Sequence, residues 1–242
     1  GDNGVGKTNI LDALHYLSVG KSFLGNSDLN NIAENEDFFS IEALIFNENK
    51  EDILKIIQNK ESRKTIKKND KNYSKIADHI GYLPSVMISP YDQNLISDSS
   101  ESRRKFMDTM ISQTDREYLF SLIHYQKTLQ QRNALLKNFH KTRTFDADSL
   151  EIYDEPLLKF GQIIFEKRKK FIHEIIPILQ EYYAIISNQK EEVLISYQSD
   201  LEQDFRILLA ENLEKDRILT YTSKGIHKDD LLFEMNGQLI KK

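Results

Sequence analysis

The apolar positions of the chain follow a helical period in three stretches. Apolar side chains recur at helical spacing between residues 10 and 17, which predicts a helix that ends at Gly20. Between residues 114 and 139 they follow alternating steps of four and three, with Arg132 on the inner stripe. A third seam runs from residue 157 to 185, and Pro177 predicts a kink within it. We expect the last two helices to be long and to pack antiparallel.

Shorter runs of apolar residues flank these helices and predict strands. Residues 38–46 and 86–88 are rich in β-forming side chains and are separated by Asn, Lys and Gly clusters, as in an antiparallel sheet with turns. From Ile218 the chain returns to short alternating segments, with Gly225 and Gly237 at turns. The pattern predicts an α/β protein with a first lobe over 1–95, a helical lobe over 96–217 and a return to the first lobe over 218–242.

Composition narrows the class of protein. The chain has 242 residues, of which 39% are hydrophobic, enough to build a core. Its net charge of −5 offers no global attraction to nucleic acid, so any contact with DNA needs a local basic patch. With no cysteine there is neither a disulfide nor a thiolate metal site, which favours a reducing, cytoplasmic location. No apolar run approaches the length of a membrane span, and we expect no membrane partner.

A phosphate-binding pattern opens the chain: glycine, any four residues, and then Gly-Lys-Thr. Glycines allow the backbone to turn its N–H groups around the phosphates, Lys7 supplies a charge, and the Thr8 hydroxyl is a ligand for Mg²⁺. The helix that follows adds the positive end of its dipole. We expect the nucleotide to be bound by Gly1, Asp2, Asn3, Gly4, Val5, Gly6, Lys7, Thr8 and Asn9.

The phosphate site leaves the reaction open. Hydrolysis also needs a second acidic motif, an apolar strand that ends in Asp and often Glu, to hold Mg²⁺ and polarise water. The nearest match, residues 150–155, would bury Glu151 in a strand core and is followed by Pro156, so we interpret it as a decoy. Two alternatives stay open: a P-loop kinase acting on a small molecule, and a non-catalytic clamp head of the SMC type, whose helical seam would have to continue for many more heptads.

Six segments in chain order carry a family resemblance: residues 1–13, 20–23, 89–92, 103–108, 131–137 and 225–231. The most specific outside the P-loop is Gln-Arg-Asn-Ala-Leu-Leu-Lys at 131–137. Together they resemble the RecF family of bacterial DNA replication and repair proteins, which are ABC-type ATPases related to SMC heads. Four positions depart from the family pattern, namely Asp2 in place of Glu, Tyr91 in place of an acid, Ile226 in place of proline and Lys228 in place of arginine.

The resemblance implies what the protein does. We expect it to bind ATP and Mg²⁺, to form an ATP-dependent homodimer, and to hold single-stranded, gapped or junction DNA while it assists RecA loading with RecO and RecR. The intact protein would be a weak DNA-stimulated ATPase. In the family the signature motif and the second acidic motif follow residue 231, so we expect the chain to be a piece of a longer protein, with no catalytic residue of its own and negligible ATPase activity.

Local basic clusters are candidates for DNA contact. Residues 127–143 carry five basic side chains and no acidic one, a stripe that could follow DNA phosphates. The alternative is that these side chains form an ordinary solvated helix face. We expect Arg132, which faces inward, to form a structural ion pair instead. Residues 60–75 predict an exposed basic hairpin that approaches DNA. His227 is a candidate sensor of the γ-phosphate or a structural turn residue. The DNA candidates are Arg103, Arg104, Lys105, Lys127 and Lys137.

Overall fold

The computed structural model describes residues 6–24, 27–47 and 50–240. The chain folds into two compact units, which divide between Ser89 and Pro90. Each has its own core of buried side chains. No helix in the described ranges is long and apolar enough to cross a membrane.

The first unit is an antiparallel sheet against which one helix packs. Helix α1 (Lys7–Val19) ends at Gly20, as predicted. The strands lie in the order β1 (Phe38–Asn47), β2 (Lys50–Asn59), β3 (Thr65–Lys68) and β4 (Lys71–Asn72). The core of this unit consists of Tyr16 and Leu17 from α1 and of Leu54, Ile56 and Ile66 from the sheet.

The predicted basic hairpin is present as β3 and β4. Asn69 and Asp70, both with positive φ, form its turn. The short helix α2 (Ile76–His79) follows, and buried His79 is joined through Nε2 to the carbonyl oxygen of Leu17 at 2.7 Å. The prediction of a strand over residues 86–88 is wrong: these residues pair with no described strand, and Val86 and Ile88 are exposed. An apolar run without a neighbouring strand edge cannot satisfy its backbone in a sheet.

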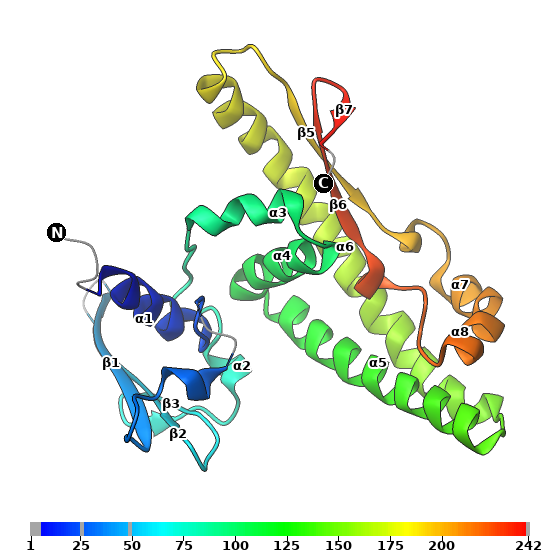
Figure 1. Cartoon of the computed structure of the whole chain (residues 1–242), viewed down its shortest axis with the longest axis horizontal. Coiled ribbons are helices and arrows are strands. Elements are labelled where there is room, and N and C mark those ends of the chain that lie inside the picture. Colours follow the sequence, from blue (N-terminus) through cyan, green and yellow to red (C-terminus); the bar gives the residue numbers. More distant parts are fainter. Residues whose placement is uncertain (1–5, 25–26, 48–49, 241–242) are drawn as a thin grey trace. The chain divides into compact units, whose positions relative to one another are not determined.

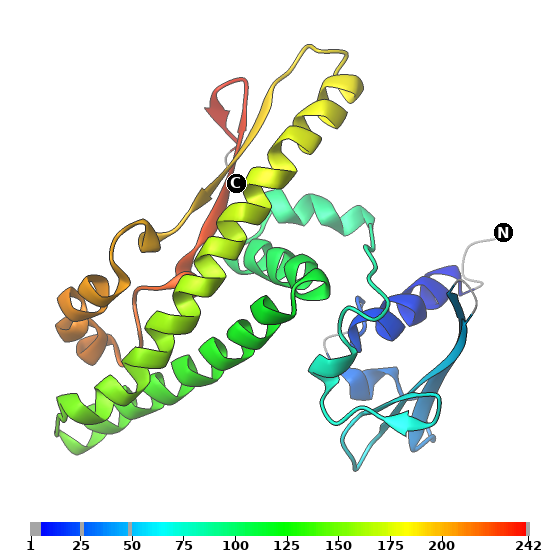
Figure 2. The ribbon, with the colours of Figure 1, turned by 180° about the vertical axis from the view of Figure 1, so that it is seen from behind.

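The second unit is built on two long helices, with shorter elements at its start. It begins with a 3₁₀ turn at Pro90–Gln93, α3 (Asn94–Ser97) and α4 (Ser100–Thr114). Helices α5 (Arg116–Thr142) and α6 (Ala147–Ile186) lie side by side and run in opposite directions, as predicted (Figure 1; Figure 2). Residues 150–155, the acidic decoy, are part of α6 and not a strand.

The α6 seam is buried only in its first part. Leu157, Ile164 and Ile172 lie in the core, together with residues of α4 and α5. Ile178, Tyr182 and Ile185, which the periodicity also placed inside, are 53%, 64% and 68% exposed. The pattern identifies an apolar face, whereas burial depends on whether another element of the unit lies against it. The helix continues through Pro177.

After α6 the chain forms a small sheet and two short helices. Strand β5 (Val193–Gln198) pairs antiparallel with β6 (Asp230–Met235), which pairs with β7 (Gln238–Leu239) across the turn at Gly237. Between β5 and β6 lie α7 (Phe205–Glu211) and α8 (Leu213–Leu219). Residues 230–235 therefore pair with a strand inside the predicted helical lobe, and the assignment of residues 218–242 to the first lobe stays a prediction.

Candidate functional site

The described part of the phosphate-binding pattern is the start of α1. Gly6 has φ 85° and ψ 12°, a left-handed conformation, and the helix begins at Lys7. The first helical hydrogen bond runs from the N–H of Ile10 to the carbonyl oxygen of Gly6 at 3.2 Å. The N–H groups of the first turn lie ahead of this bond, at the positive end of the helix dipole. Residues 1–5 of the pattern lie outside the described residues.

The surroundings of Gly6 fit a phosphate group. Among the described residues, a Cβ atom built on Gly6 would meet no atom within 4 Å, so the glycine is required by its backbone angle and not by lack of space. The side chains of Lys7, Thr8 and Asn9, the next three residues of the chain, are exposed. The Thr8 hydroxyl is the predicted ligand for Mg²⁺, and the described residues contain no cluster of three or more His, Asp or Glu side chains that could hold a metal. These residues can therefore hold an anion by dipole, charge and hydroxyl.

Asp12 fixes the turn that follows α1. Its carboxylate accepts hydrogen bonds from the hydroxyl of Ser22 at 2.7 Å and from the N–H of Phe23 at 2.7 Å. On the other side of the turn, Lys64 donates to the carbonyl oxygen of Gly20 and pairs with Asp28 at 2.6 Å. The segment at 20–23, one of the six that carried the resemblance, is thus held to α1 by Asp12 and to the residue before β3 by Lys64.

Arg132 forms the predicted buried ion pair. Its side chain is fully buried; Nε donates to Asp154 at 2.6 Å and Nη1 to Asp216 at 2.8 Å. Nη1 also donates to the hydroxyl of Thr222 at 2.9 Å. The next residue, Asn133, accepts hydrogen bonds through Oδ1 from both the N–H and the hydroxyl of Thr222. The segment 131–137 therefore ties α5 to α6, to α8 and to the chain just before residue 225.

Arg103 and Arg104 hold the start of β6. Arg103 is 3% exposed and forms a two-pronged pair with Asp230, at 2.6 and 3.0 Å. Its Nη1 donates to the carbonyl oxygens of Leu95 and Asp98. A guanidinium that is buried and paired in this way has a structural role in this unit, and the DNA contact of Arg103 stays a prediction. Half-buried Arg104 donates to the carbonyl oxygen of Asp229 at 2.6 Å, and burial lowers its pKa.

Arg168 is the principal site residue that the sequence reasoning missed. It is 1% exposed and lies in the middle of α6. Its guanidinium donates to Asp229 at 2.8 Å, to Asp108 at 2.7 Å, to the hydroxyl of Tyr118 at 3.0 Å and to the carbonyl oxygen of Ile226 at 2.8 Å. One side chain thus joins α4, α5 and α6 to the 225–231 segment. Its position, four residues after Ile164, continues the α6 seam and was the signal that could have revealed it.

Asp229 is the acceptor at the centre of this cluster. Its side chain is fully buried and also accepts a hydrogen bond from the hydroxyl of Tyr197. Burial raises the pKa of Asp229, and Arg168 and Tyr197 act in the opposite direction. A buried carboxylate depends on such partners to remain ionised. We call Asp108, Tyr118, Arg168, Tyr197 and Asp229 the Arg168 cluster.

His227 is held on both ring nitrogens. Nδ1 lies 2.9 Å from the hydroxyl of Tyr125, and Nε2 lies 2.9 Å from the carbonyl oxygen of Thr222. Burial lowers the pKa of His227 to about 4, so the ring is neutral at pH 7. A neutral ring has a single N–H, which Nε2 donates to the carbonyl, and Nδ1 then accepts from Tyr125. His227 therefore has a structural role in this turn, and its sensing of nucleotide stays a prediction.

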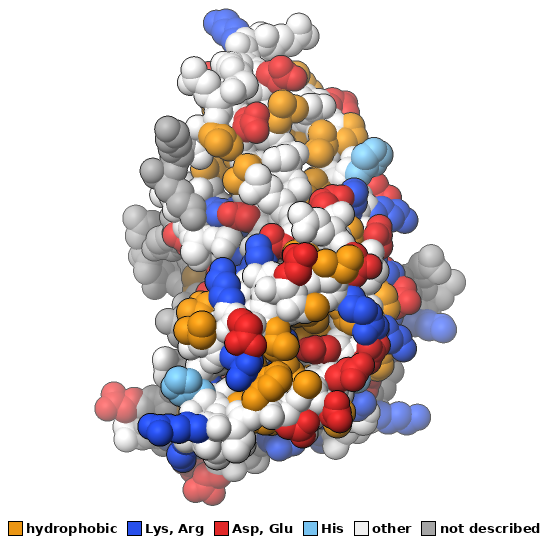
Figure 3. Space-filling view, turned by 90° about the vertical axis from the view of Figure 1, so that its right-hand side faces the viewer, with side chains coloured by type: hydrophobic (Ala, Val, Ile, Leu, Met, Phe, Trp, Pro, Cys, Tyr) orange, Lys and Arg blue, Asp and Glu red, His pale blue; other side chains and the backbone are white. Residues whose placement is uncertain are grey.

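The three predicted lysines are exposed. Lys105 lies on α4, and Lys127 and Lys137 lie on α5. Figure 3 shows that, on the face it presents, basic and acidic side chains are interspersed with hydrophobic ones and do not form a single basic surface. In the hairpin, Lys68 is paired with Asp52 at 2.7 Å and Lys64 with Asp28, which reduces the charge this segment can offer to DNA.

Comparison with known proteins decides the family. No family model matches the chain. It is 49% identical over 243 residues to the DNA replication and repair protein RecF of Flavobacterium johnsoniae and 44% identical to that of Parabacteroides distasonis. The alignments cover 100% of this chain and 68% and 66% of those proteins. The chain belongs to the RecF family. It spans about two thirds of the length of these relatives.

Solved RecF structures share the fold. One is a structure of the recombination mediator protein RecF-ATPrS in the RecFOR pathway, with a TM-score of 0.89 and 29% sequence identity. The alignment covers 99% of this chain and 67% of that chain. A second, of RecF-ATP, has a TM-score of 0.92 and 28% identity over 98% of this chain and 66% of its own. The mixture of long helices and antiparallel sheets is therefore a RecF arrangement, and the resemblance expected from the six segments is confirmed.

Proposed function

We propose that the protein is an ATP-dependent DNA-binding protein of recombinational repair and replication restart. In this role it holds single-stranded or gapped DNA and, with RecO and RecR, assists the loading of RecA. Family membership supports the role, because the relatives are DNA replication and repair proteins and the matching structures carry ATP or ATPrS within the RecFOR pathway. The cytoplasm is the location that this role requires.

The observation that carries the proposal is the start of α1. Three features that favour a phosphate group occur together here. The left-handed Gly6 precedes the first-turn N–H groups, which carry the positive end of the helix dipole. Lys7 adds a positive charge and Thr8 a hydroxyl, and both side chains are exposed. ATP and Mg²⁺ are the proposed ligands: Lys7 neutralises the phosphate charge and Thr8 places its hydroxyl on the metal. The first lobe is then of the ABC type, with the helical unit inserted in it.

Nucleotide acts in this proposal as a switch. ATP binding favours a homodimer that holds DNA, and slow hydrolysis releases it. The lysines at 105, 127 and 137 are the proposed DNA contacts, since they are exposed on α4 and α5. Helix α6 ends at Ile186 and the chain returns as β5, so the inserted helices are far shorter than the coiled coil of a structural clamp.

Equilibrium binding of a fluorescent ATP analogue with Mg²⁺ tests the site. Lys7→Ala is expected to weaken binding by at least about tenfold, the loss typical of a charge-assisted phosphate contact. Thr8→Ala is expected to remove the dependence on Mg²⁺, and Thr8→Ser, which keeps the hydroxyl, to restore it. Lys50→Ala, an exposed lysine at the start of β2, is the control. Equal affinities for Lys7→Ala and Lys50→Ala would contradict the assignment.

A further inference from the structure

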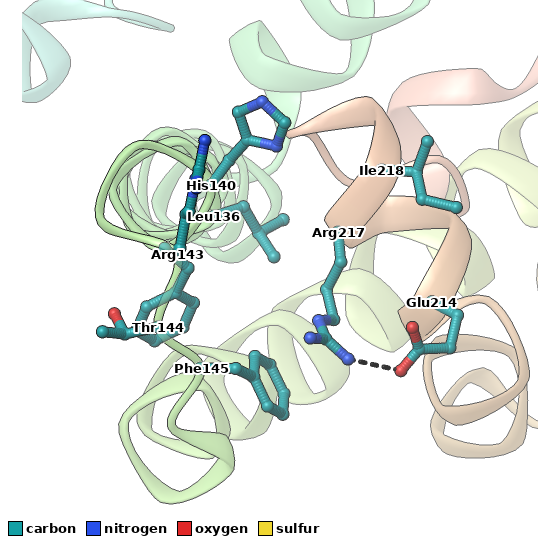
Figure 4. Close-up of a pocket in the computed structure, with 9 residues that line it drawn as sticks. Leu136, His140, Arg143, Thr144, Phe145, Glu214, Arg217 and Ile218 are labelled. Carbon is teal, nitrogen blue, oxygen red and sulfur yellow. Dashed lines mark hydrogen bonds and ion pairs between the residues drawn. The ribbon is translucent and has the colours of Figure 1, made fainter.

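A pocket lies where the end of α5 meets α8. It has a volume of about 570 Å³. His140, Arg143 and Thr144 come from the end of α5 and the residues after it, and Glu214, Arg217 and Ile218 come from α8 (Figure 4). The structure places the two arginines on opposite walls of this hollow.

Phe145 and Arg217 form a preassembled stack beside the hollow. The guanidinium carbon of Arg217 lies 4.1 Å from the centre of the Phe145 ring, and Nη1 pairs with Glu214 at 2.5 Å. The Phe145 ring packs edge-on against buried Phe139, with ring centres 5.5 Å apart. Two planar groups are therefore held in place before any ligand arrives, which lowers the entropy cost of stacking a third.

Arg143 gives the other wall its charge. It ends α5 in a left-handed conformation, with φ 55° and ψ 32°, and its side chain is exposed. With Arg217 it outweighs Glu214, so the pocket carries a net positive charge next to an aromatic face. That combination suits a ligand that joins a planar ring to an anionic group. An unpaired nucleotide has both, since its base stacks on aromatic and guanidinium planes and its phosphate pairs with arginine.

We propose that this pocket takes an unpaired nucleotide of single-stranded DNA, with the base against the Phe145–Arg217 stack and a phosphate at Arg143. The inference rests on the proposed DNA-binding function and deepens it, because it names the part of a gapped substrate that this end of the helical unit would recognise. A base inside a duplex is stacked and paired and cannot enter, so the pocket distinguishes a strand from a duplex.

Three variants of the protein separate this idea from a general effect of charge. Asparagine tolerates the left-handed backbone, so Arg143→Asn is expected to preserve the melting temperature while it weakens binding of a fluorescein-labelled oligothymidine by at least about fivefold. Glu214→Gln is expected to tighten binding, because it removes the negative charge of the pocket. Lys141→Asn removes a charge of the same helix end without lining the pocket, and is expected to change strand and duplex binding equally.

Fluorescence anisotropy with the oligothymidine and with a blunt duplex of the same length decides the outcome. The pocket would be supported if Arg143→Asn lowers and Glu214→Gln raises the affinity for the oligothymidine while the affinity for the duplex stays the same. Competition by dTMP should show the same order of the variants. Equal effects on strand and duplex, or competition by an oligoglutamate peptide but not by dTMP, would overturn it in favour of general charge or of an acidic protein partner. If the unmodified protein binds neither DNA, the proposed function fails as well; if it binds both and the variants change nothing, only the pocket fails.

Discussion

Replacing Arg168 by methionine is expected to loosen the second unit around Asp229. The guanidinium lies inside the unit with four hydrogen bonds, to two carboxylates, a tyrosine hydroxyl and a backbone carbonyl. Methionine fills much of the same volume but donates no hydrogen bond. The carboxylate of Asp229, fully buried, then loses the one cation that pairs with it among the described residues.

The size of the effect follows from this burial. Removing one partner of a buried ion pair costs about 3–5 kcal/mol, because the other charge stays buried without compensation. The matched control is Lys169→Met, at the next position of α6. Its pair with Glu202 at 3.0 Å is more than half exposed on both sides. Exposed pairs of this kind contribute at most about 1 kcal/mol.

Hydrogen exchange read by mass spectrometry locates the loss. In Arg168→Met, peptides from α4 and β6 are expected to lose about two to three and a half orders of magnitude of protection, which corresponds to about 3–5 kcal/mol. Peptides from β1 and β2 serve as the internal reference. If the protection of α4 and β6 changes no more in Arg168→Met than in Lys169→Met, the Arg168 cluster does not hold the unit together and the reasoning is refuted.

The same variant should also become sensitive to pH. Burial raises the pKa of Asp229, and loss of Arg168 removes an interaction that lowers it. An acid whose pKa is higher in the folded state than in the unfolded state costs stability at pH 7, and this cost disappears as the pH falls toward the unfolded pKa of about 4. The variant is therefore expected to regain stability, relative to Lys169→Met, as the pH is lowered from 7 to 5.

Three further outcomes are expected. Gly225→Ala should lower the melting temperature strongly, because its Cβ would lie 2.5 Å from the hydroxyl oxygen of Tyr125 at a backbone φ of 132°. A Cβ at Gly237 would meet no described atom within 4 Å, so Gly237→Ala should cost only about 1 kcal/mol of stability. The His227 ring should show no NMR titration between pH 5 and 8, since its pKa is about 4. Because the unfolded chain takes up that proton near pH 6.5 and the folded chain does not, stability should fall from pH 6.5 toward 4, and His227→Gln should remove part of this fall, as measured by urea unfolding.

The sequence predicted the helices well because periodicity records which side of a helix is apolar. It also predicted the ion pair of Arg132, since a charged residue on an inner stripe needs a partner. Arg168 escaped because it stands in the run Lys-Arg-Lys-Lys at 167–170, which looks like a solvated face, although its spacing from Ile164 continued the seam. Periodicity alone does not tell a buried arginine from an exposed one when its neighbours are basic.

At residues 86–88 and at the end of the α6 seam, the apolar pattern predicted pairing or burial that the structure does not have. Both have the apolar composition expected for their predicted place, yet Ile88 and Ile185 are exposed. Pairing and burial depend on a second element, and local sequence does not contain it. For the same reason no motif revealed that Arg103, a candidate for DNA contact, would find Asp230 more than a hundred residues away along the chain.

ATP-dependent DNA binding is tested by comparing the affinity for DNA with and without nucleotide. The dissociation constant for a gapped duplex would be measured with and without ATP and Mg²⁺, in the unmodified protein and in Lys7→Ala. ATP is expected to tighten binding by about 5-fold to about 150-fold, the range of a typical coupling between two sites, and Lys7→Ala is expected to abolish this response. The same affinity with and without ATP, or an unchanged response in Lys7→Ala, would contradict this expectation.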